Sequence, residues 1–253
     1  MATLEAIVEL ANQTMLERPI SDYCPNGLQV EGRSEVSKIV SGVTASQALV
    51  DEAIKRGADL LLVHHGYFWK GENPCVVGIK KKRIKGLLQN DISLLAYHLP
   101  LDVHPVLGNN AQLAELLDLT TDGPLDSESR VSVGLVGHLK TPLSVKQFSD
   151  LLQTKLKRSP QVITNDESDI IKTVGWCTGG AQGYIEKAIA ANVDAYISGE
   201  ISEPTVHIAR ESGVHYFAAG HHATERYGAM ALGKKLAEAF DIEHEFVDID
   251  NPV

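Results

Sequence analysis

The feature that most constrains the fold is a regular alternation of short apolar runs with amphipathic segments. Apolar runs predict strands at 38–44, 59–66 and 92–99. Helical periodicity predicts helices between them, at 46–58 and 81–90. Strands that alternate with helices form βαβ units, whose strands lie parallel. The sequence therefore predicts an α/β fold with a mostly parallel sheet.

The alternation resumes after a polar, turn-rich stretch at 120–130, where we place a domain boundary. The later strands are predicted at 131–139, 161–165, 171–179, 194–200, 214–220 and 242–249. The later helices are predicted at 144–156, 181–193, 203–213 and 222–240. Two similar α/β lobes, each a mixed sheet flanked by helices, account for this order of elements.

The remaining segments are two further helices and two loops. Apolar spacing predicts helices at 3–17 and 109–119. Prolines and glycines predict a loop at 21–32, and Pro100 and Pro105 predict another at 98–110. Thr44 and Ser46 follow a strand, where they suit helix capping better than substrate contact.

An internal repeat relates the two lobes. Residues 38–66 align with residues 172–200, and both segments run from strand through polar turn and helix to a second strand. Asp59 falls opposite Asp194 after a one-residue insertion. The aligned strand ends differ, since one carries two histidines and the other carries Gly199 and Glu200.

Composition excludes several classes of protein. The 253 residues carry a formal net charge of −10, which argues against nucleic acid as a partner. The basic run at 80–83 is best explained as a solvated helix start. Three isolated cysteines predict neither a disulfide framework nor a thiolate zinc site, and they favour the reducing cytoplasm. No apolar run approaches the ~20 residues of a membrane span, and the acidic N-terminus does not resemble a signal peptide.

Imidazoles and carboxylates collect where the apolar strands end. Open α/β sheets bind ligands beyond the carboxyl ends of their strands. The side chains at those ends are His64, His65, His98, Asp102, Glu200, His221, His222 and Glu225. This donor set suits zinc, iron, manganese or nickel. A strand has no structural need for two terminal histidines, so the pair at 64–65 favours a metal site.

The spacing of these residues suggests two ions. Adjacent histidines point in different directions, and two ions about 3.5 to 4 Å apart would use both. His221 and Glu225 lie four residues apart at a helix start, so they face one point. Asp102 lies in a predicted loop and can reach the site. His98 is better explained as a residue that hydrogen-bonds a metal ligand and orients it. The other five histidines are expected to be structural: His104, His138, His207, His215 and His244.

Six segments resemble one known family. They are "SDYCPNGLQVEG", "GVTASQALVDEA", "LLLVHHGYFWKG", "YHLPLDVHPVLGNNAQLA", "WCTGGAQGYI" and "AAGHHATERYG". They are similar to segments of the GTP cyclohydrolase 1 type 2 homologue family, also called the NIF-three-like dinuclear metal centre hexameric proteins. The chain resembles the short bacterial form, and the resemblance is weakest at about 120–170.

The resemblance implies an architecture and a site. It implies a toroidal homohexamer in which each chain binds two divalent metal ions between its lobes. It implies one lobe of residues 1–124 plus 220–253 and a second, inserted lobe of residues 125–219. By position, the implied metal ligands are His64, His65, Asp102, His221 and Glu225, with Glu225 as the bridge.

Two classes of function remain open at this stage. The first is a metal-dependent hydrolase acting on a nucleotide-like small molecule, with Glu200 or His98 as candidate general base. The second is a non-catalytic metal-binding ring that stores, delivers or senses metal, or acts as a scaffold for a partner. Five ligands for two ions leave coordination positions open, which favours the enzyme.

Overall fold

Two sheets of different strand order organise the chain. The computed structural model describes residues 1–17 and 19–253, and its internal contacts divide the chain into two units. Unit 1 comprises residues 1–107 and 226–250, and unit 2 comprises residues 108–225 and 251–253. The family resemblance places these boundaries differently, at 124/125 and 219/220.

Unit 1 contains a five-stranded sheet of order β13-β4-β5-β6-β2. Its strands are β2 (Gly27–Val30), β4 (Lys38–Thr44), β5 (Leu60–His65), β6 (Ser93–Ala96) and β13 (Glu243–Phe246). The four strands from β13 to β6 pair in parallel, and β2 pairs antiparallel with β6. A separate two-stranded ladder joins β1 (Ala2–Thr3) to β3 (Glu35–Val36). The predicted, mostly parallel sheet is confirmed.

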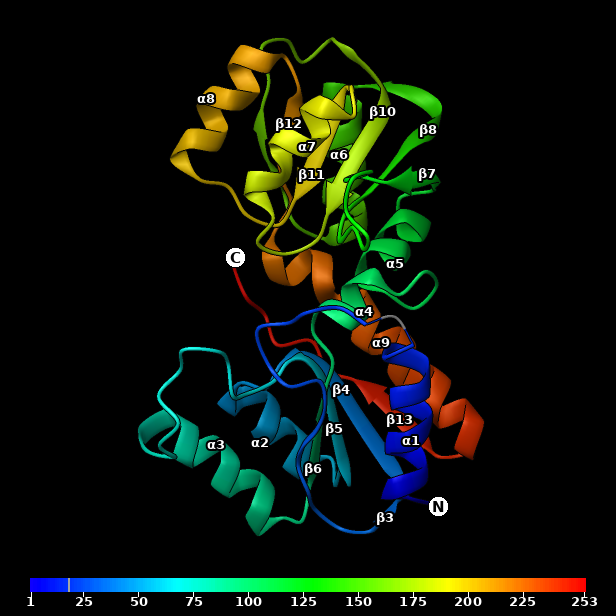
Figure 1. Ribbon diagram of the computed structural model, residues 1–253, viewed down its shortest axis with the longest axis vertical. Helices are drawn as coiled ribbons and strands as arrows, with labels where there is room; N and C mark the ends of the chain where they lie inside the picture. The colour runs from blue at the N-terminus through cyan, green and yellow to red at the C-terminus, as the bar shows by residue number, and fades with distance from the viewer. Residues whose placement is uncertain (18) are drawn as a thin grey trace. The chain divides into compact units, whose positions relative to one another are not determined.

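Helices cover both faces of this sheet (Figure 1). They are α1 (Leu4–Met15), α2 (Gln47–Lys55), α3 (Gly78–Gln89), α4 (Leu99–Val103) and the unit 1 part of α9 (His221–Phe240). Side chains alternate along β5: Leu61 and Val63 pack with α2 and α3, while Leu60 and Leu62 pack with α1 and α9. A continuous apolar run is therefore buried on both faces, as parallel strands require.

Unit 2 contains a six-stranded mixed sheet of order β7-β8-β10-β11-β12-β9. Its strands are β7 (Leu119–Pro124), β8 (Leu135–Ser144), β9 (Gln161–Ile163), β10 (Ile170–Cys177), β11 (Ala195–Ser198) and β12 (His215–Ala218). Only the β10-β11-β12 core is parallel. The helices are α5 (Asn109–Leu116), α6 (Val145–Leu156), α7 (Ile185–Ala190) and α8 (Glu203–Ser212), with a 3₁₀ turn η1 (Gln182–Tyr184) before α7.

Two local predictions were wrong, and a third stretch, predicted to be turn-rich, contains a strand. The loop expected at 21–32 contains strand β2, whose amide groups complete the edge of the unit 1 sheet beside β6. The loop expected at 98–110 contains helix α4, because Pro100 lies in its first turn, where a missing N–H costs nothing. The boundary stretch expected at 120–130 contains most of strand β7, which pairs with β8.

The aligned aspartates of the repeat accept equivalent hydrogen bonds in the two units. Asp59 precedes β5 and accepts hydrogen bonds from Ser37 N, Ser37 Oγ and Lys38 N, at the start of β4. Asp194 precedes β11 and accepts bonds from Lys172 N, Thr173 N and Thr173 Oγ1, near the start of β10. Burial opposes ionisation of both carboxyls, but these hydrogen bonds outweigh it and lower both pKa values. Each aspartate thus ties the first strand of its βαβ unit to the second.

Candidate metal centre

Unit 1 gathers four donors beyond the carboxyl ends of β5 and β6. His64 and His65 are the last two residues of β5. His98 follows β6 and is the N-cap residue of α4, and Asp102 lies within α4. The strand-end rule therefore located these side chains correctly.

His64 is held in the form that binds metal ions. It is completely buried, and its Nδ1 lies 3.0 Å from the carbonyl oxygen of Tyr97. Because a carbonyl can only accept, Nδ1 carries the proton, and in the neutral ring Nε2 keeps its lone pair. Nε2 lies 3.5 Å from Oδ1 of Asp102. A backbone carbonyl on one ring nitrogen is the usual partner of a metal-ligating histidine.

His65 is oriented in a similar way by a hydroxyl group. Its Nδ1 lies 3.0 Å from Thr44 Oγ1. Of the two residues predicted to cap a helix, Ser46 caps α2, whereas Thr44 contacts the His65 ring. The His64 and His65 ring centroids are 4.5 Å apart and the ring planes are tilted by 46°. Ring nitrogens of His64, His65 and His98 all lie within 4.8 Å of one another.

Asp102 reaches this cluster from a helix and not from a loop. Its backbone N–H donates to the carbonyl oxygen of His98 at 3.2 Å, which closes one helical turn. The prediction that Asp102 lies in a loop was therefore wrong. Asp102 is 5% exposed, and a buried carboxylate needs a hydrogen-bonded or cationic partner.

Unit 2 gathers a second set of donors beyond β11 and β12. His221 opens α9, with its Nδ1 2.7 Å from Glu200 Oε1 and its Nε2 3.1 Å from Glu225 Oε2. Burial opposes protonation of His221, but the bonds and charges of Glu225 and Glu200 outweigh it and raise its pKa to about 9. The predicted four-residue spacing of His221 and Glu225 on one helix face is confirmed, and Glu225 is almost fully buried.

Gly179 allows the backbone to approach the unit 2 donors closely. Its φ of +70° suits glycine, and a Cβ there would lie 2.0 Å from Glu225 Oε1 and 3.1 Å from His221 Nε2. Its N–H donates to Thr224 Oγ1 on α9. The turn after β10 is thus fastened to the helix that carries Glu225.

The donor chemistry of each unit fits transition-metal ions. Imidazoles and buried carboxylates are ligands that zinc, iron, manganese and nickel accept. The clusters can therefore hold metal ions, and two donors of unit 1, His64 and His65, are oriented by a backbone carbonyl and by a hydroxyl group. Preorganised donors are typical of metal sites.

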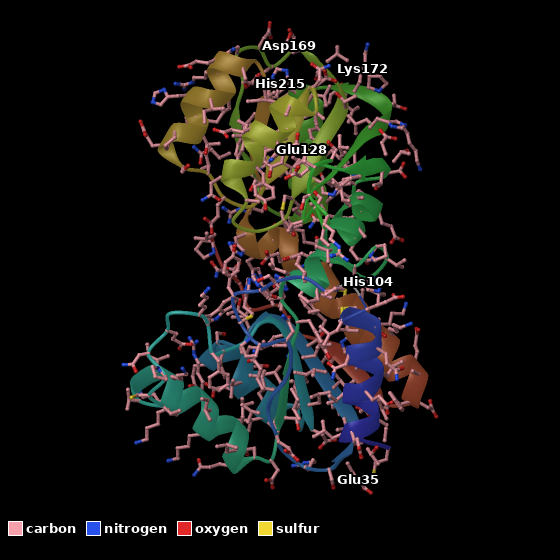
Figure 2. The ribbon with its side chains drawn as sticks, viewed as in Figure 1. Glu35, His104, Glu128, Asp169, Lys172 and His215 are labelled. Atoms are coloured by element: carbon pink, nitrogen blue, oxygen red, sulfur yellow. The ribbon has the colours of Figure 1, made fainter. Side chains whose placement is uncertain are left out.

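The histidines predicted to be structural all have hydrogen bonds. His104, labelled in Figure 2, accepts from Val106 N and Leu107 N just after α4. The others bond to nearby side chains: His138 to Asp122, His207 to Glu203, His215 to Thr164 and His244 to Ser41.

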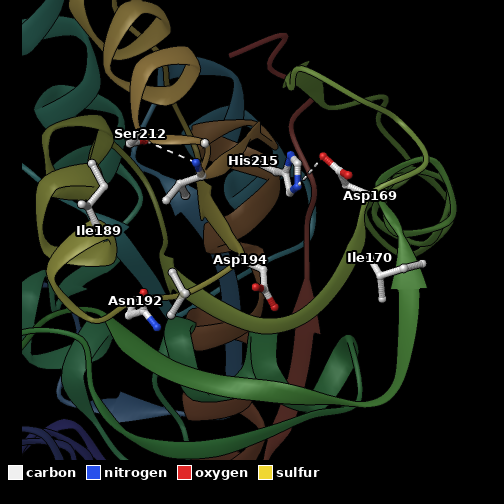
Figure 3. A pocket seen from close by; sticks show the side chains of 10 residues that line it. Asp169, Ile170, Ile189, Asn192, Asp194, Ser212 and His215 are labelled. Carbon is white, nitrogen blue, oxygen red and sulfur yellow. Dashed lines mark hydrogen bonds and ion pairs between the residues drawn. The ribbon is translucent and has the colours of Figure 1, made fainter.

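Unit 2 also has a polar cavity of about 300 Å³ at the opposite ends of its strands (Figure 3). His215, the first residue of β12, points toward Asp169 there, and Asp194 lies at the start of β11. Ligands of open α/β sheets bind beyond the carboxyl ends of strands, so this cavity is not the expected site.

Sequence reasoning missed three residues that shape the donor clusters. Asp22 bonds to His98, Trp69 packs against the same ring, and Gly179 touches Glu225. The segment around Asp22 was read only as a loop because its glycines and proline dominate the pattern. Aspartate before a turn is also a common capping residue, and that signal could have found it.

These features define a class of protein: two α/β units, each with imidazole and carboxylate donors beyond the carboxyl ends of its strands. The chain belongs to the Duf34/NIF3 (NGG1p interacting factor 3) family, whose profile matches residues 2–252. The family resemblance found in the sequence is therefore confirmed.

Individual relatives match over almost their full length. A Pseudomonas aeruginosa protein named "GTP cyclohydrolase 1 type 2 homolog" is 57% identical over 249 residues, covering 98% of each chain. An Escherichia coli K12 protein of the same name is 50% identical over 246 residues, covering 96% of this chain and 97% of the relative. The solved structure of protein ybgI, described as of unknown function, has a TM-score of 0.94 at 48% identity, with both chains fully covered.

Within residues 1–17 and 19–253, no helix combines the length and the apolar character that a bilayer span requires.

Proposed function

We propose that this protein binds two divalent metal ions per chain and acts as a metal-dependent hydrolase on a nucleotide-like substrate. The observation that carries the proposal is the state of His64 and His65. Both rings have Nδ1 engaged, and His64 presents its Nε2 beside the buried carboxylate of Asp102.

The proposed ligands are His64, His65, Asp102, His221 and Glu225. Glu225 is the proposed bridge, since one carboxylate can give an oxygen to each of two ions. Zinc, iron, manganese and nickel all accept this donor set, and geometry and availability decide among them. The five residues leave coordination positions for substrate and water, as catalytic sites do.

Bound divalent ions would supply Lewis acidity, which polarises the bond to be hydrolysed and makes water a better nucleophile. The chain's own residues orient the donors. The Tyr97 carbonyl and the Thr44 hydroxyl fix two imidazole rings, and Glu200 fixes Nδ1 of His221. Glu200 and His98 remain the candidates for general base.

The substrate class rests on the family. Relatives carry the name "GTP cyclohydrolase 1 type 2 homolog", which makes GTP the first compound to test. We also propose a cytoplasmic, ring-shaped homohexamer. Support for self-association comes from three neighbouring apolar side chains, Val76, Val77 and Ile79, which are 46%, 61% and 67% exposed. Sedimentation velocity tests the hexamer.

The deciding experiment measures metal content per chain by elemental analysis, on protein purified without an affinity tag. We expect about two ions per wild-type chain and a sharp loss in Glu225→Ala. The matched control is Glu203→Ala, because Glu203 also pairs with a histidine four residues away, His207, but on the exposed face of α8. This control should keep the wild-type content.

Other results would overturn parts of the proposal. Content near zero after supplementation would remove the metal site. One ion per chain, unaffected by Glu225→Ala, would mean that the bridge is wrong. Full loading without turnover of GTP or other nucleotides would favour the non-catalytic metal-binding ring.

A further inference from the structure

Asp22 is a buried carboxylate whose two oxygens are fully engaged. Oδ1 accepts hydrogen bonds from Tyr23 N and from His98 Nδ1, both at 2.6 Å. Oδ2 accepts from Asn26 Nδ2 at 2.8 Å and from Leu99 N at 2.9 Å. Its side chain is only 4% exposed. Four donors converge on one carboxylate, so its position is strongly determined.

This carboxylate stays ionised at neutral pH. Burial by itself would raise the pKa of Asp22, but the hydrogen bonds from His98 and Asn26 outweigh it and lower the pKa to about 2. An ionised carboxylate can only accept hydrogen bonds. Nδ1 of His98 must therefore carry a proton, and in the neutral ring Nε2 has the lone pair.

The ring of His98 is fixed from other directions too. Its backbone N–H donates to Asn26 Oδ1 at 2.7 Å. The Trp69 ring packs nearly perpendicular to it, with centroids 4.9 Å apart, and Trp69 Nε1 donates to the Gly66 carbonyl. The loops before β2 and after β5 thus hold the imidazole from two sides.

His98 faces the donor cluster of unit 1. Its ring centroid lies 5.1 Å from that of His64 and 5.7 Å from that of His65. A ring nitrogen of His98 lies within 4.8 Å of ring nitrogens of both. Because Asp22 occupies Nδ1, Nε2 is the nitrogen that can serve a molecule bound there.

We infer that Asp22 is a positioning residue that fixes the tautomer of His98, so that Nε2 accepts a hydrogen bond from water or from a substrate O–H or N–H group at the metal centre. The pairing of Asp22 with His98 stands on the contacts alone, whereas the role of Nε2 rests on the proposed function. A nucleophile or base oriented by a third group is a recurring arrangement in hydrolases.

The alternative, a separate metal site made of Asp22, Cys24 and His98, is disfavoured by the same contacts. These three residues lie close enough to share an ion. However, four hydrogen bonds already fill the carboxylate. Burial, with the Asp22 charge, raises the pKa of Cys24 to about 12, which keeps its sulfur a thiol.

The test is magic-angle-spinning NMR of protein labelled with ¹⁵N-histidine, with His98 assigned by its absence in His98→Asn. In metal-free wild type we expect a protonated Nδ1 and a lone pair on Nε2. In Asp22→Asn a single amide oxygen remains to accept the hydrogen bonds that two carboxylate oxygens accept in the wild type. The charge-assisted bond to His98 becomes a neutral one, so the ratio of the Nε2–H to the Nδ1–H tautomer of His98 should rise about tenfold. Glu203→Gln, beside the exposed His207, is the matched control and should leave His98 unchanged.

Adding ¹¹³Cd²⁺ separates this inference from the proposed function. We expect cadmium–nitrogen coupling at His64 and His65, and at His98 only a shift of the Nε2 resonance. Coupling at His98 would make it a ligand and overturn the inference, as would an unshifted Nε2 in a loaded site. Coupling at no histidine would overturn the metal proposal and leave the tautomer assignment standing. If Asp22→Asn does not fold, a wild-type spectrum with Nε2 protonated would still refute the inference.

Discussion

The substitution Asp59→Asn tests whether a single carboxylate ties β4 to β5. One oxygen of Asp59 accepts three hydrogen bonds from Ser37 and Lys38, at 2.7 to 3.1 Å. The other oxygen pairs with Arg33 at 2.8 Å. Asparagine has the same shape, but it loses the charge and turns an acceptor into a donor that faces other donors.

The magnitude follows from these contacts. Hydrogen bonds to a charged group contribute about 1.5–3 kcal/mol each and neutral ones about half as much, so the substitution should cost about 2–4 kcal/mol. The ion pair adds little, because the Arg33 side chain is 47% exposed and such pairs contribute about 1 kcal/mol or less. Arg33→Ala also removes two exposed hydrogen bonds, to the carbonyl oxygens of Asn90 and Asp91, but it should still cost clearly less than Asp59→Asn. Asp194→Asn should destabilise unit 2 as Asp59→Asn destabilises unit 1.

The assay is a urea titration followed by pulsed hydrogen exchange and mass spectrometry. Peptides from β4 report on unit 1 and peptides from β10 report on unit 2. Asp59→Asn should lower the free energy of unfolding measured at β4. The reasoning is refuted if that loss is under about 0.5 kcal/mol, the usual scatter of surface substitutions. It is equally refuted if Arg33→Ala costs as much as Asp59→Asn.

Two further predictions concern the donor clusters. Gly179→Ala should displace the Glu225 carboxylate and lower metal content, because a Cβ would lie 2.0 Å from Oε1 and the φ of +70° is strained for alanine. Gly183→Ala has open space around its Cβ and is the control; equal metal content in the two variants would contradict the close approach. The lowered pKa of Asp22, about 2 instead of 3.8, should stabilise the fold by about 2 kcal/mol. That contribution is complete above pH 4 and disappears as the pH falls through 2, so acid titrations of wild type and Asp22→Asn should converge at low pH.

The sequence predicted the order of elements well, because periodicity and strand-end chemistry are local signals. The strand at 38–44 matches β4 residue for residue, and Ser46 caps α2 as expected. Strand β2 was missed because its few residues sit among breakers and gain their stability from pairing with β6. Helix α4 was missed because two prolines within six residues suggested a loop.

The donor types were also visible in the sequence, but their orientation was not. Adjacent histidines at the end of a buried strand signalled a ligand. The groups that fix them are a backbone carbonyl at Tyr97 and a hydroxyl at Thr44, which no sequence pattern marks. The Asp22–His98 bond joins residues 76 positions apart, and only the fold brings such residues together.

The division of the chain has a consequence for its synthesis on the ribosome. Unit 2 is almost entirely one continuous segment, residues 108–225, whereas unit 1 needs residues 226–250 as well. Until β13 emerges, β4 is an unprotected edge strand, although five of its seven residues are buried in the complete fold. Such an edge invites pairing with another chain. Chains truncated before residue 243 should therefore depend on chaperones, although they contain the whole continuous segment of unit 2.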